Sequence, residues 1–204
     1  MRIITISREF GSGGRELGKR LADSLGIPCY DHEIIDMVAE NHGFDKNHVA
    51  HISEKDISVF YPTTIAHRLV APHPITQQSI SITVAEHELI KELANEGNCV
   101  IVGRCADIIL RDMNPMNIFV YADRQSKLKR CENRAEENEH FTEKEILGKM
   151  KQIDKERAAY RSLFTEEDWG RKESYHLCIN TSDKEIKALI PAVAEYVRLW
   201  FGQN

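Results

Sequence analysis

The chain has 204 residues, of which 42% are hydrophobic and 29% charged, and its formal net charge is −5. This length suits one domain with a substantial core, and the composition is that of an ordinary water-soluble globular protein. The negative net charge argues against a broad nucleic-acid-binding surface, and no apolar stretch reaches the length of a membrane span. We therefore expect neither a nucleic-acid partner nor a membrane partner.

The cysteines and histidines do not form a recognisable metal or disulfide pattern. The five cysteines are scattered without a close pair, at Cys29, Cys99, Cys105, Cys131 and Cys178. An odd, dispersed set argues for reduced thiols and a cytoplasmic location. His48 and His51 are three residues apart, but zinc needs further ligands, so we interpret both as solvent-exposed. The chain opens on a strand-like run with no visible signal peptide, which also predicts a cytoplasmic protein.

Short apolar runs, each bounded by loop residues, are predicted to be β-strands. They are Arg2–Ser7, Pro28–Asp31, Cys99–Val102, Asn117–Tyr121 and His176–Asn180. Helical patterns fill the intervals between them. The predicted helices are Glu16–Leu25, Glu33–Asn41, Ser79–Asn95, Asp107–Asp112, Ser126–Asn138, a helix from Thr142 to about Arg161, and Lys184–Trp200. Thr142 is predicted to cap the helix that it begins, because Glu145 stands three residues later in the capping-box position.

The alternation of strands and helices predicts an α/β fold. Such an order gives a five-stranded parallel sheet covered on both faces, a three-layer α/β/α sandwich, in which ligands bind at the carboxyl edge of the sheet. We expect a single domain over residues 1–204, with an acceptor-binding insertion at about 32–78 and a lid at about 150–172. The segment Asp45–Gln78 is expected to be loop with helix fragments, since its periodicity is patchy.

A glycine cluster separates the first strand from the first helix. Gly11, Gly13 and Gly14 remove side chains where a backbone approaches a phosphate, and the amides that open the following helix form an anion-binding site. A tight turn without a ligand is the plain alternative, although three glycines with flanking arginines exceed what a turn needs. A dinucleotide fingerprint fits poorly, because the pattern is GSGGRELG and no clear ribose-binding position follows.

The match to the phosphate-binding pattern GxxxxGK[ST] is partial. Arg8 falls on the first glycine, Gly13 on the last, Gly14 on the lysine and Arg15 on the following residue. Glu16 stands where nucleotide kinases often carry Thr. Arg8 or Arg15 can replace the lysine charge, since a guanidinium holds phosphate oxygens well. Ser12 or Ser7 is the candidate for the missing hydroxyl at magnesium.

Several segments in order resemble the nucleoside monophosphate kinases of the P-loop superfamily, and most closely the cytidylate kinase-like group. The opening segment ITISREFGSGGRELGKRLADSLGIPCYD looks like the first strand, phosphate loop, helix and second strand. VIVGR, NIFVYADRQSKLKR, DKERAAYRSLF and HLCINTSD are similar to the later strands, the basic helix and the arginine-bearing lid. The lysine-less opening SREFGSGGRELG looks like a divergent branch of this group.

The resemblance implies roles for particular residues. The donor-binding residues would be Arg8, Gly11, Ser12, Gly13, Gly14, Arg15 and Glu16. The acceptor-binding residues would be Asp31, His32 and Arg104, with Arg104 on the acceptor's phosphate. Arg15, Arg130, Arg157 and Arg161 would act on the transferring phosphoryl group. No protein metal ligand is assigned, and the implied cofactors are ATP and Mg²⁺.

Some positions depart from the family pattern or have another interpretation. Val102 and Cys105 stand where acidic residues are expected, and Met37 where an arginine is expected. Arg157 and Arg161 share a helix face, and a solvated charged face is the alternative role for both. Arg104 has the alternative of pairing with a nearby acid. His32 can contact an acceptor or cap a helix. Trp169 can stack on a base, although packing beneath the lid fits it better.

These observations predict an ATP-dependent kinase of a nucleoside monophosphate, most simply CMP or a related pyrimidine nucleotide. The missing lysine and carboxylate leave two alternatives open, a nucleotide- or phosphate-binding regulatory protein without turnover and a kinase of another small acceptor. The apolar side of Ser79–Asn95 is compatible with a homodimer.

Overall fold

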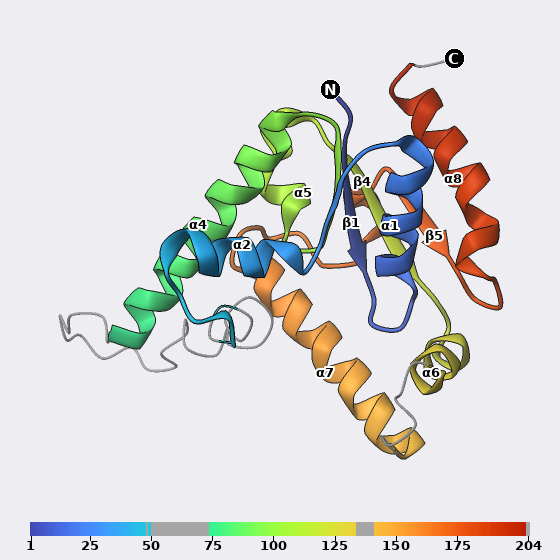
Figure 1. Cartoon of the computed structure of the whole chain (residues 1–204). Helices are drawn as coiled ribbons and strands as arrows, with labels where there is room; N and C mark the ends of the chain where they lie inside the picture. The colour runs from blue at the N-terminus through green and yellow to red at the C-terminus, as the bar shows by residue number, and fades with distance from the viewer. Residues whose placement is uncertain (48, 50–73, 134–140, 203–204) are drawn as a thin grey trace.

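The computed structural model describes residues 1–47, 49, 74–133 and 141–202. At its centre is a parallel sheet with the strand order β2-β3-β1-β4-β5 (Figure 1). The strands are β1 (Ile3–Arg8), β2 (Cys29–Tyr30), β3 (Cys99–Val102), β4 (Met116–Tyr121) and β5 (Leu177–Asn180). The predicted α/β/α sandwich with a five-stranded parallel sheet is confirmed.

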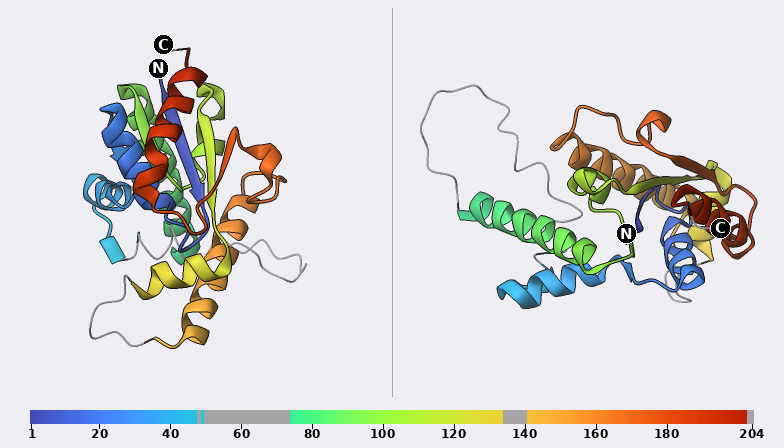
Figure 2. Two further views of the ribbon diagram at one scale, coloured as in Figure 1. Left: turned by 90° about the vertical axis from the view of Figure 1, so that its right-hand side faces the viewer. Right: turned by 90° about the horizontal axis from the view of Figure 1, so that it is seen from above.

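Helices cover both faces of the sheet, as the view from above shows (Figure 2). One face packs against α1 (Gly14–Leu25) and α8 (Ile186–Trp200), through residues such as Leu21 and Val193. The other face packs against α2 (Glu33–His42), α4 (Pro74–Glu96) and α5 (Ala106–Ile109), through residues such as Val38 and Ile90. β1 contributes Ile3 to one core and Ile4 to the other, because successive side chains of a strand point to opposite faces.

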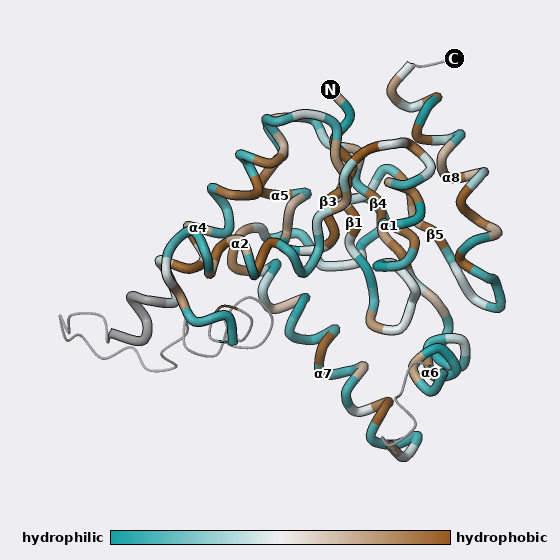
Figure 3. The backbone as a smooth tube through the Cα atoms, viewed as in Figure 1, coloured by the Kyte–Doolittle hydropathy of each residue, from teal (hydrophilic) through white to brown (hydrophobic). Residues whose placement is uncertain are grey.

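Two helices lie beyond the carboxyl edge of the sheet, α6 (Arg124–Glu132) and α7 (Glu143–Ser162). Figure 3 shows apolar residues gathered in the central strands, whereas α6 is mainly hydrophilic. Short 3₁₀ turns lie at Arg111–Met113, before β4, and at Lys172–Ser174, before β5. The ends of β1, β3, β4 and β5, with α6 and α7, therefore surround one edge of the sheet, where α/β folds bind ligands.

The predicted elements differ from the observed ones mainly at their boundaries. The pattern expected at Asp107–Asp112 divides into α5 and a 3₁₀ turn, and α4 begins at Pro74, inside the segment expected to be irregular. The helix expected over Ser126–Asn138 begins at Arg124, after the N-cap residue Asp123. The rest of that pattern, at 134–140, and most of the expected insertion, including His48 and His51, lie outside the described residues.

The capping box predicted at Thr142 is confirmed. The Thr142 hydroxyl accepts a hydrogen bond from the Glu145 amide at 3.3 Å, and the Thr142 amide donates to the Glu145 carboxylate at 2.7 Å. Few side chains of the first half of α7 are buried, Ile146 and Met150 being the exceptions. The start of this helix consequently depends on its cap more than on tertiary packing.

Replacing Thr142 by Ala should lower the free energy of unfolding by about 0.5–2 kcal/mol, because the Glu145 amide loses its acceptor. Amide hydrogen exchange should accelerate in the first two turns of α7. Thr142→Ser keeps the hydroxyl and should behave as the wild type. Equal exchange rates in the Ala variant and the wild type would show that packing, not the cap, holds the start of α7.

Candidate active site

The loop between β1 and α1 turns twice through the left-handed region. Gly11 and Gly13 have φ of 76° and 83°, values that glycine adopts at little cost. The Ser12 amide and hydroxyl both donate to the Glu9 carbonyl, at 3.3 and 2.8 Å, which closes the turn. The local sequence therefore fixes a compact loop directly before the first turn of α1.

The carbonyl groups of this loop are held by hydrogen bonds from side chains. Arg130 donates to the carbonyls of Gly11 and Ser12, at 3.4 and 3.5 Å, and the Thr181 hydroxyl donates to the Ser12 carbonyl at 2.7 Å. Arg130 itself is fixed by the carbonyls of Thr181 and Lys184 at the end of β5. Side chains from α6 and from the residue after β5 thus hold the glycine loop, although they lie more than a hundred residues away from it in sequence.

The amides of Gly13, Gly14 and Arg15 open α1 and have no acceptor among the residues that the structure describes. The first amides of a helix lack intrahelical partners, and the helix dipole adds positive potential there. With the Gly11 and Ser12 carbonyls already hydrogen-bonded, this helix start has the form of a phosphate-binding site.

Arg8, the last residue of β1, runs beneath the start of α1. A Cβ at Gly14 would lie 2.4 Å from the Arg8 Cβ, and a Cβ at Gly103 would lie 1.8 Å from the Arg8 Nη1. Gly103 also has a φ of 83°. The Arg8 side chain therefore extends from the phosphate loop to the turn after β3. Residue 14, the position of the usual lysine, has no room for a side chain beside the Cβ and Cγ of Arg8.

Asp31, directly after β2, lies between two of the loop arginines. Its carboxylate is 2.5 Å from the Arg15 Nε and 3.8 Å from the Arg8 Nη2. The Asp31 side chain is mostly buried, whereas that of Arg15 is 59% exposed. Both arginines therefore approach this carboxylate on the pocket side of the loop.

A cavity of about 590 Å³ opens in front of the loop. Basic side chains dominate its charged lining: Arg8, Arg15, Arg104, Arg130, Lys149, Arg157 and Arg161. The acidic lining residues are Glu9, Asp31, Glu145 and Glu156. A basic pocket of this volume suits a small anionic ligand.

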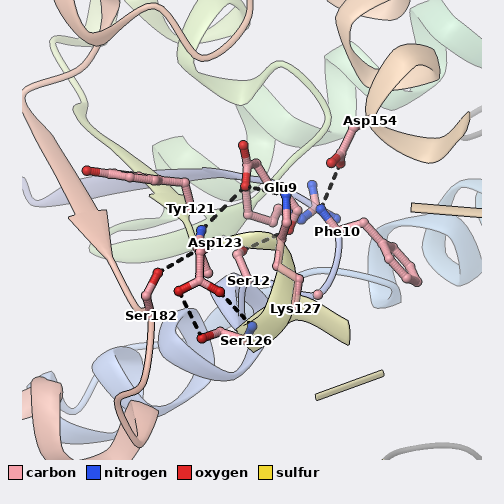
Figure 4. A network of polar contacts seen from close by, with 12 residues as sticks. Glu9, Phe10, Ser12, Tyr121, Asp123, Ser126, Lys127, Asp154 and Ser182 are labelled. Atoms are coloured by element: carbon pink, nitrogen blue, oxygen red, sulfur yellow. Dashed lines mark hydrogen bonds and ion pairs between the residues drawn. The ribbon is translucent and has the colours of Figure 1, made fainter. Parts of the chain in front are cut away.

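Helix α7 is joined directly to the phosphate loop (Figure 4). The Phe10 amide donates to Asp154 at 2.7 Å, and Arg157 donates to the Arg8 carbonyl at 2.9 Å. Burial raises the pKa of Asp154, although the Phe10 amide, Arg157 and Lys127 oppose this shift. Arg157 also pairs with Asp154, on the same helix, at 3.3 Å.

Figure 4 also shows how α6 joins the loop. Lys127 pairs with Glu9 at 2.8 Å, and Glu9 accepts the Ala122 amide at 3.4 Å. Asp123 accepts the Ser126 amide at 2.7 Å, and its own amide donates to Ser182 at 2.8 Å. The loop, α6 and the end of β5 consequently form one polar network around the phosphate site.

The turn after β3 forms the inner end of the pocket. Gly103, Arg104 and Cys105 all have positive φ, and Arg104 lies 3.4 Å from Glu86 with both side chains buried. Burial raises the pKa of the Cys105 thiol, and the nearby Asp107 raises it further. Pairing with an acid, the alternative role considered for Arg104, is therefore observed, while its side chain still lines the pocket.

Arg161 is buried beneath the pocket rather than extended over it. It forms a short ion pair with Asp107, lies 3.5 Å from Glu167, and faces the Tyr175 ring at 5.6 Å. Burial by itself lowers the pKa of Arg161, but the Asp107 carboxylate more than offsets this, so the pKa is raised. In this conformation the guanidinium fixes the end of α7 to α5.

Most of the predicted site residues lie on one pocket. Those that line it are Arg8, Gly11, Gly13, Gly14, Arg15, Asp31, His32, Arg104, Arg130, Arg157 and Arg161. Ser12 and Glu16 are not among the lining residues. The Ser12 hydroxyl is buried against the Glu9 carbonyl, and the Glu16 carboxylate pairs with Arg20 at 2.8 Å on the outer side of α1.

The two sequence candidates for a hydroxyl ligand of Mg²⁺ differ in their position. The Ser12 hydroxyl donates to the Glu9 carbonyl, whereas Ser7 lines the pocket. No group of three or more His, Cys, Asp or Glu is placed to hold a metal ion in the described parts of the chain. Mg²⁺ commonly binds through substrate phosphates with few protein ligands.

Two pocket residues, Phe10 and Tyr160, were not predicted from the sequence. Tyr160 follows Arg157 by three residues, so helical spacing puts it on the same face and is the signal in the sequence for it. Trp169, which was expected to pack beneath the lid or to stack on a base, lines the cavity and packs edge-on against Phe119 at 5.5 Å.

The exclusion of a side chain at residue 14 by Arg8 can be tested with a double-mutant cycle. Gly14→Ala should lower the free energy of unfolding by about 1–3 kcal/mol, since the added Cβ overlaps that of Arg8. In an Arg8→Gly background the same change should cost much less, giving a coupling of about 0.5–3 kcal/mol in urea denaturation. Additive costs would mean that the two residues do not compete for this space.

Comparisons with solved structures agree with this fold. An uncharacterized protein from Eubacterium ventriosum is 30% identical, with a TM-score of 0.69 over 97% of this chain and 98% of that chain. Shikimate kinase from Bacteroides thetaiotaomicron is 14% identical, with a TM-score of 0.57 over 98% of each chain. A gluconokinase from Sinorhizobium meliloti is 13% identical, with a TM-score of 0.51 over 100% of this chain and 98% of that one. No curated protein sequence matches the chain.

The similarity to the two named kinases shows a P-loop kinase fold. The cytidylate kinase-like family matches residues 3–183, which is most of the chain, as the sequence resemblance predicted. Family and fold together support a phosphotransferase that acts on a small substrate. The chain belongs to the cytidylate kinase-like family.

Proposed function

We propose that the protein transfers the γ-phosphoryl group of ATP to a small acceptor in the pocket, and that the acceptor is a nucleoside monophosphate, CMP or a related pyrimidine nucleotide. The observation that carries this proposal is the start of α1. The amides of Gly13, Gly14 and Arg15 have no acceptor in the described part of the chain and open onto a basic cavity of about 590 Å³.

The donor phosphates are assigned to the loop. Backbone amides and the helix dipole bind the phosphate oxygens, and Arg15 lies beside them on an exposed, movable side chain. Arg8 adds a fixed guanidinium between the loop and the turn after β3. Together these two arginines supply the charge that a lysine at residue 14 would otherwise provide.

The acceptor is assigned to the space bounded by Asp31, Arg8 and α7. Phosphoryl transfer needs both phosphates held in line, with their charge neutralised and water excluded. Arg157 is tied to the Arg8 carbonyl and lies over Phe10, so α7 covers this space and brings a cation to it. Arg161 is assigned a positioning role, because its ion pair with Asp107 fixes the end of α7.

The proposal is tested by measuring ADP release with CMP, UMP, AMP and GMP, and with shikimate and gluconate as acceptors of other classes. A pyrimidine monophosphate should give the highest kcat/KM. If only shikimate or gluconate were phosphorylated, the acceptor would be another small molecule and not a nucleotide.

A second candidate is a nucleotide-binding protein without turnover, favoured by the glycine at position 14. Isothermal titration calorimetry with ATP distinguishes it from the kinase. Tight ATP binding without ADP release from any acceptor in the panel would support this regulatory role. A normal turnover number would eliminate it.

The assembly and location are also part of the proposal. Ile80 and Val84 are exposed on α4, which supports a homodimer through this helix, and light scattering of the purified protein tests it. A cytoplasmic location remains our proposal from the cysteine pattern. None of the described helices is both long and apolar enough to cross a bilayer.

Reversing the charge of Arg15 tests the donor site. Arg15→Glu should weaken ATP binding at least tenfold, because it places a carboxylate beside the loop amides and next to Asp31. Arg20→Glu is the matched control, since it makes the same charge change on the outer side of α1. Equal ATP affinities of the two variants in calorimetry would show that Arg15 is not near the phosphates.

A further inference from the structure

The face that α7 turns to the pocket extends along most of the helix. The α7 residues that line the cavity are Glu145, Ile146, Lys149, Ile153, Glu156, Arg157, Tyr160 and Arg161. They recur at helical spacing and therefore form one face. At 1.5 Å per residue this face is about 24 Å long. The cavity thus continues along α7 well beyond the arginines at the end of the helix.

The phosphate loop meets this face near its middle. The Phe10 amide donates to Asp154 at 2.7 Å, and Arg157 donates to the Arg8 carbonyl at 2.9 Å. The lining residues that follow these contacts lie toward α5, to which Arg161 is tied by its ion pair. Those that precede the contacts belong to the half of α7 that lies beside α6 (Figure 1). The loop consequently separates two parts of the cavity.

We call the part beside α6 the outer arm. The residues that form it are Phe141, Ile146, Lys149 and Ile153, all of which line the cavity. On the α6 side it is bordered by Cys131, another lining residue. A Cβ at Gly11 would lie 3.1 Å from the Cys131 Sγ, so the outer arm adjoins the loop at Gly11.

The direction of phosphoryl transfer assigns a ligand to each part of the cavity. The proposed function places the acceptor beside Asp31 and Arg8, and the Arg8 guanidinium extends away from the loop to Gly103. The donor and the acceptor approach the transferred phosphoryl group from opposite sides, roughly in line. The part of the donor that follows its phosphates should therefore leave the loop on the Gly11 side, toward the outer arm.

The side chains of the outer arm suit a flat apolar group. Phe141 is 49% exposed, its ring centre lies 5.7 Å from the Lys149 amine, and Ile153 adds an aliphatic surface. The two carboxylates beside them, those of Glu145 and Glu156, already accept hydrogen bonds from neighbouring residues. Phosphate gains little from such a surface, whereas the π-face of a base stacks on an aromatic ring.

We propose that the outer arm binds the base of the nucleoside triphosphate donor, which stacks on Phe141 and packs against Ile153. This inference rests on the proposed function and deepens it, because it assigns the donor base to α7 and the residue before its cap. Contacts to the face of a base do not distinguish the groups on its edge. The donor site should therefore accept ATP and GTP alike.

The test compares the wild type with Phe141→Ala in calorimetry with ATP, GTP and inorganic triphosphate. ATP and GTP should each bind about tenfold more weakly to the variant, because one stacking contact is lost. Inorganic triphosphate has no base and should bind equally to both proteins. Ile153→Ala should weaken ATP binding about threefold through lost apolar contact. Tyr196→Ala, which removes an exposed ring from α8, is the matched control and should leave all three affinities unchanged.

Each outcome separates the outer arm from the proposed kinase activity. Weaker ATP and GTP binding with unchanged triphosphate binding supports the outer arm, even if the wild type phosphorylates no acceptor, a result that would refute only the kinase. Unchanged ATP affinity in Phe141→Ala with normal turnover would refute the outer arm and leave the kinase intact. An equal loss for triphosphate would show that Phe141 acts on the loop and not on a base. Weaker binding of CMP, with ATP unaffected, would reverse the two parts of the cavity and overturn the assignment.

Discussion

The path of one side chain, that of Arg8, determines how this site is built. The side chain leaves the end of β1, passes beneath Gly14 and reaches Gly103 in the turn after β3. It therefore connects the region that binds donor phosphates with the region that receives the acceptor. Two glycines are required for this path, and one of them occupies the position of the usual catalytic lysine. The missing lysine is, on this account, the steric consequence of the close approach of the Arg8 Cβ and Cγ to residue 14.

The remainder of the site supports the loop on three sides. Arg130 and Thr181 hold its carbonyls, Glu9 binds Lys127 of α6, and the Phe10 amide binds Asp154 of α7. These contacts come from segments far apart in sequence. A loop whose carbonyls are already hydrogen-bonded presents its amides with little reorganisation, which favours strong binding of phosphate oxygens.

The sequence predicted those features that depend on local pattern. Apolar runs marked the strands, their alternation with helices fixed the parallel sheet, and Thr142 with Glu145 specified a helix start to the residue. Parallel strands end at one edge, so Asp31, Arg104 and the glycine loop could be brought together before the structure was known. The spacing of the cysteines and histidines likewise depends on local sequence, and it argued against disulfide and zinc sites.

Features that depend on tertiary contact were not predictable in this way. Ser12 and Glu16 both fit the local pattern of a phosphate loop. In the structure, the Glu16 carboxylate pairs with Arg20 and the Ser12 hydroxyl donates to the Glu9 carbonyl, so neither side chain lines the pocket. The overlap between Arg8 and residue 14 follows from how β1 meets α1. That Arg161 is buried against Asp107 follows likewise from tertiary packing, because the partner of a polar group is a property of its surroundings.

The central claim is that backbone amides, helped by the guanidinium groups of Arg8 and Arg15, bind a polyphosphate without a lysine. Titration of ¹⁵N-labelled protein with ATP, followed by amide chemical shifts, tests it most directly. The account predicts that the largest shifts fall on Gly11, Gly13, Gly14 and Arg15, and that inorganic triphosphate reproduces them. Saturable ATP binding with these amides unmoved and the shifts gathered elsewhere would contradict it.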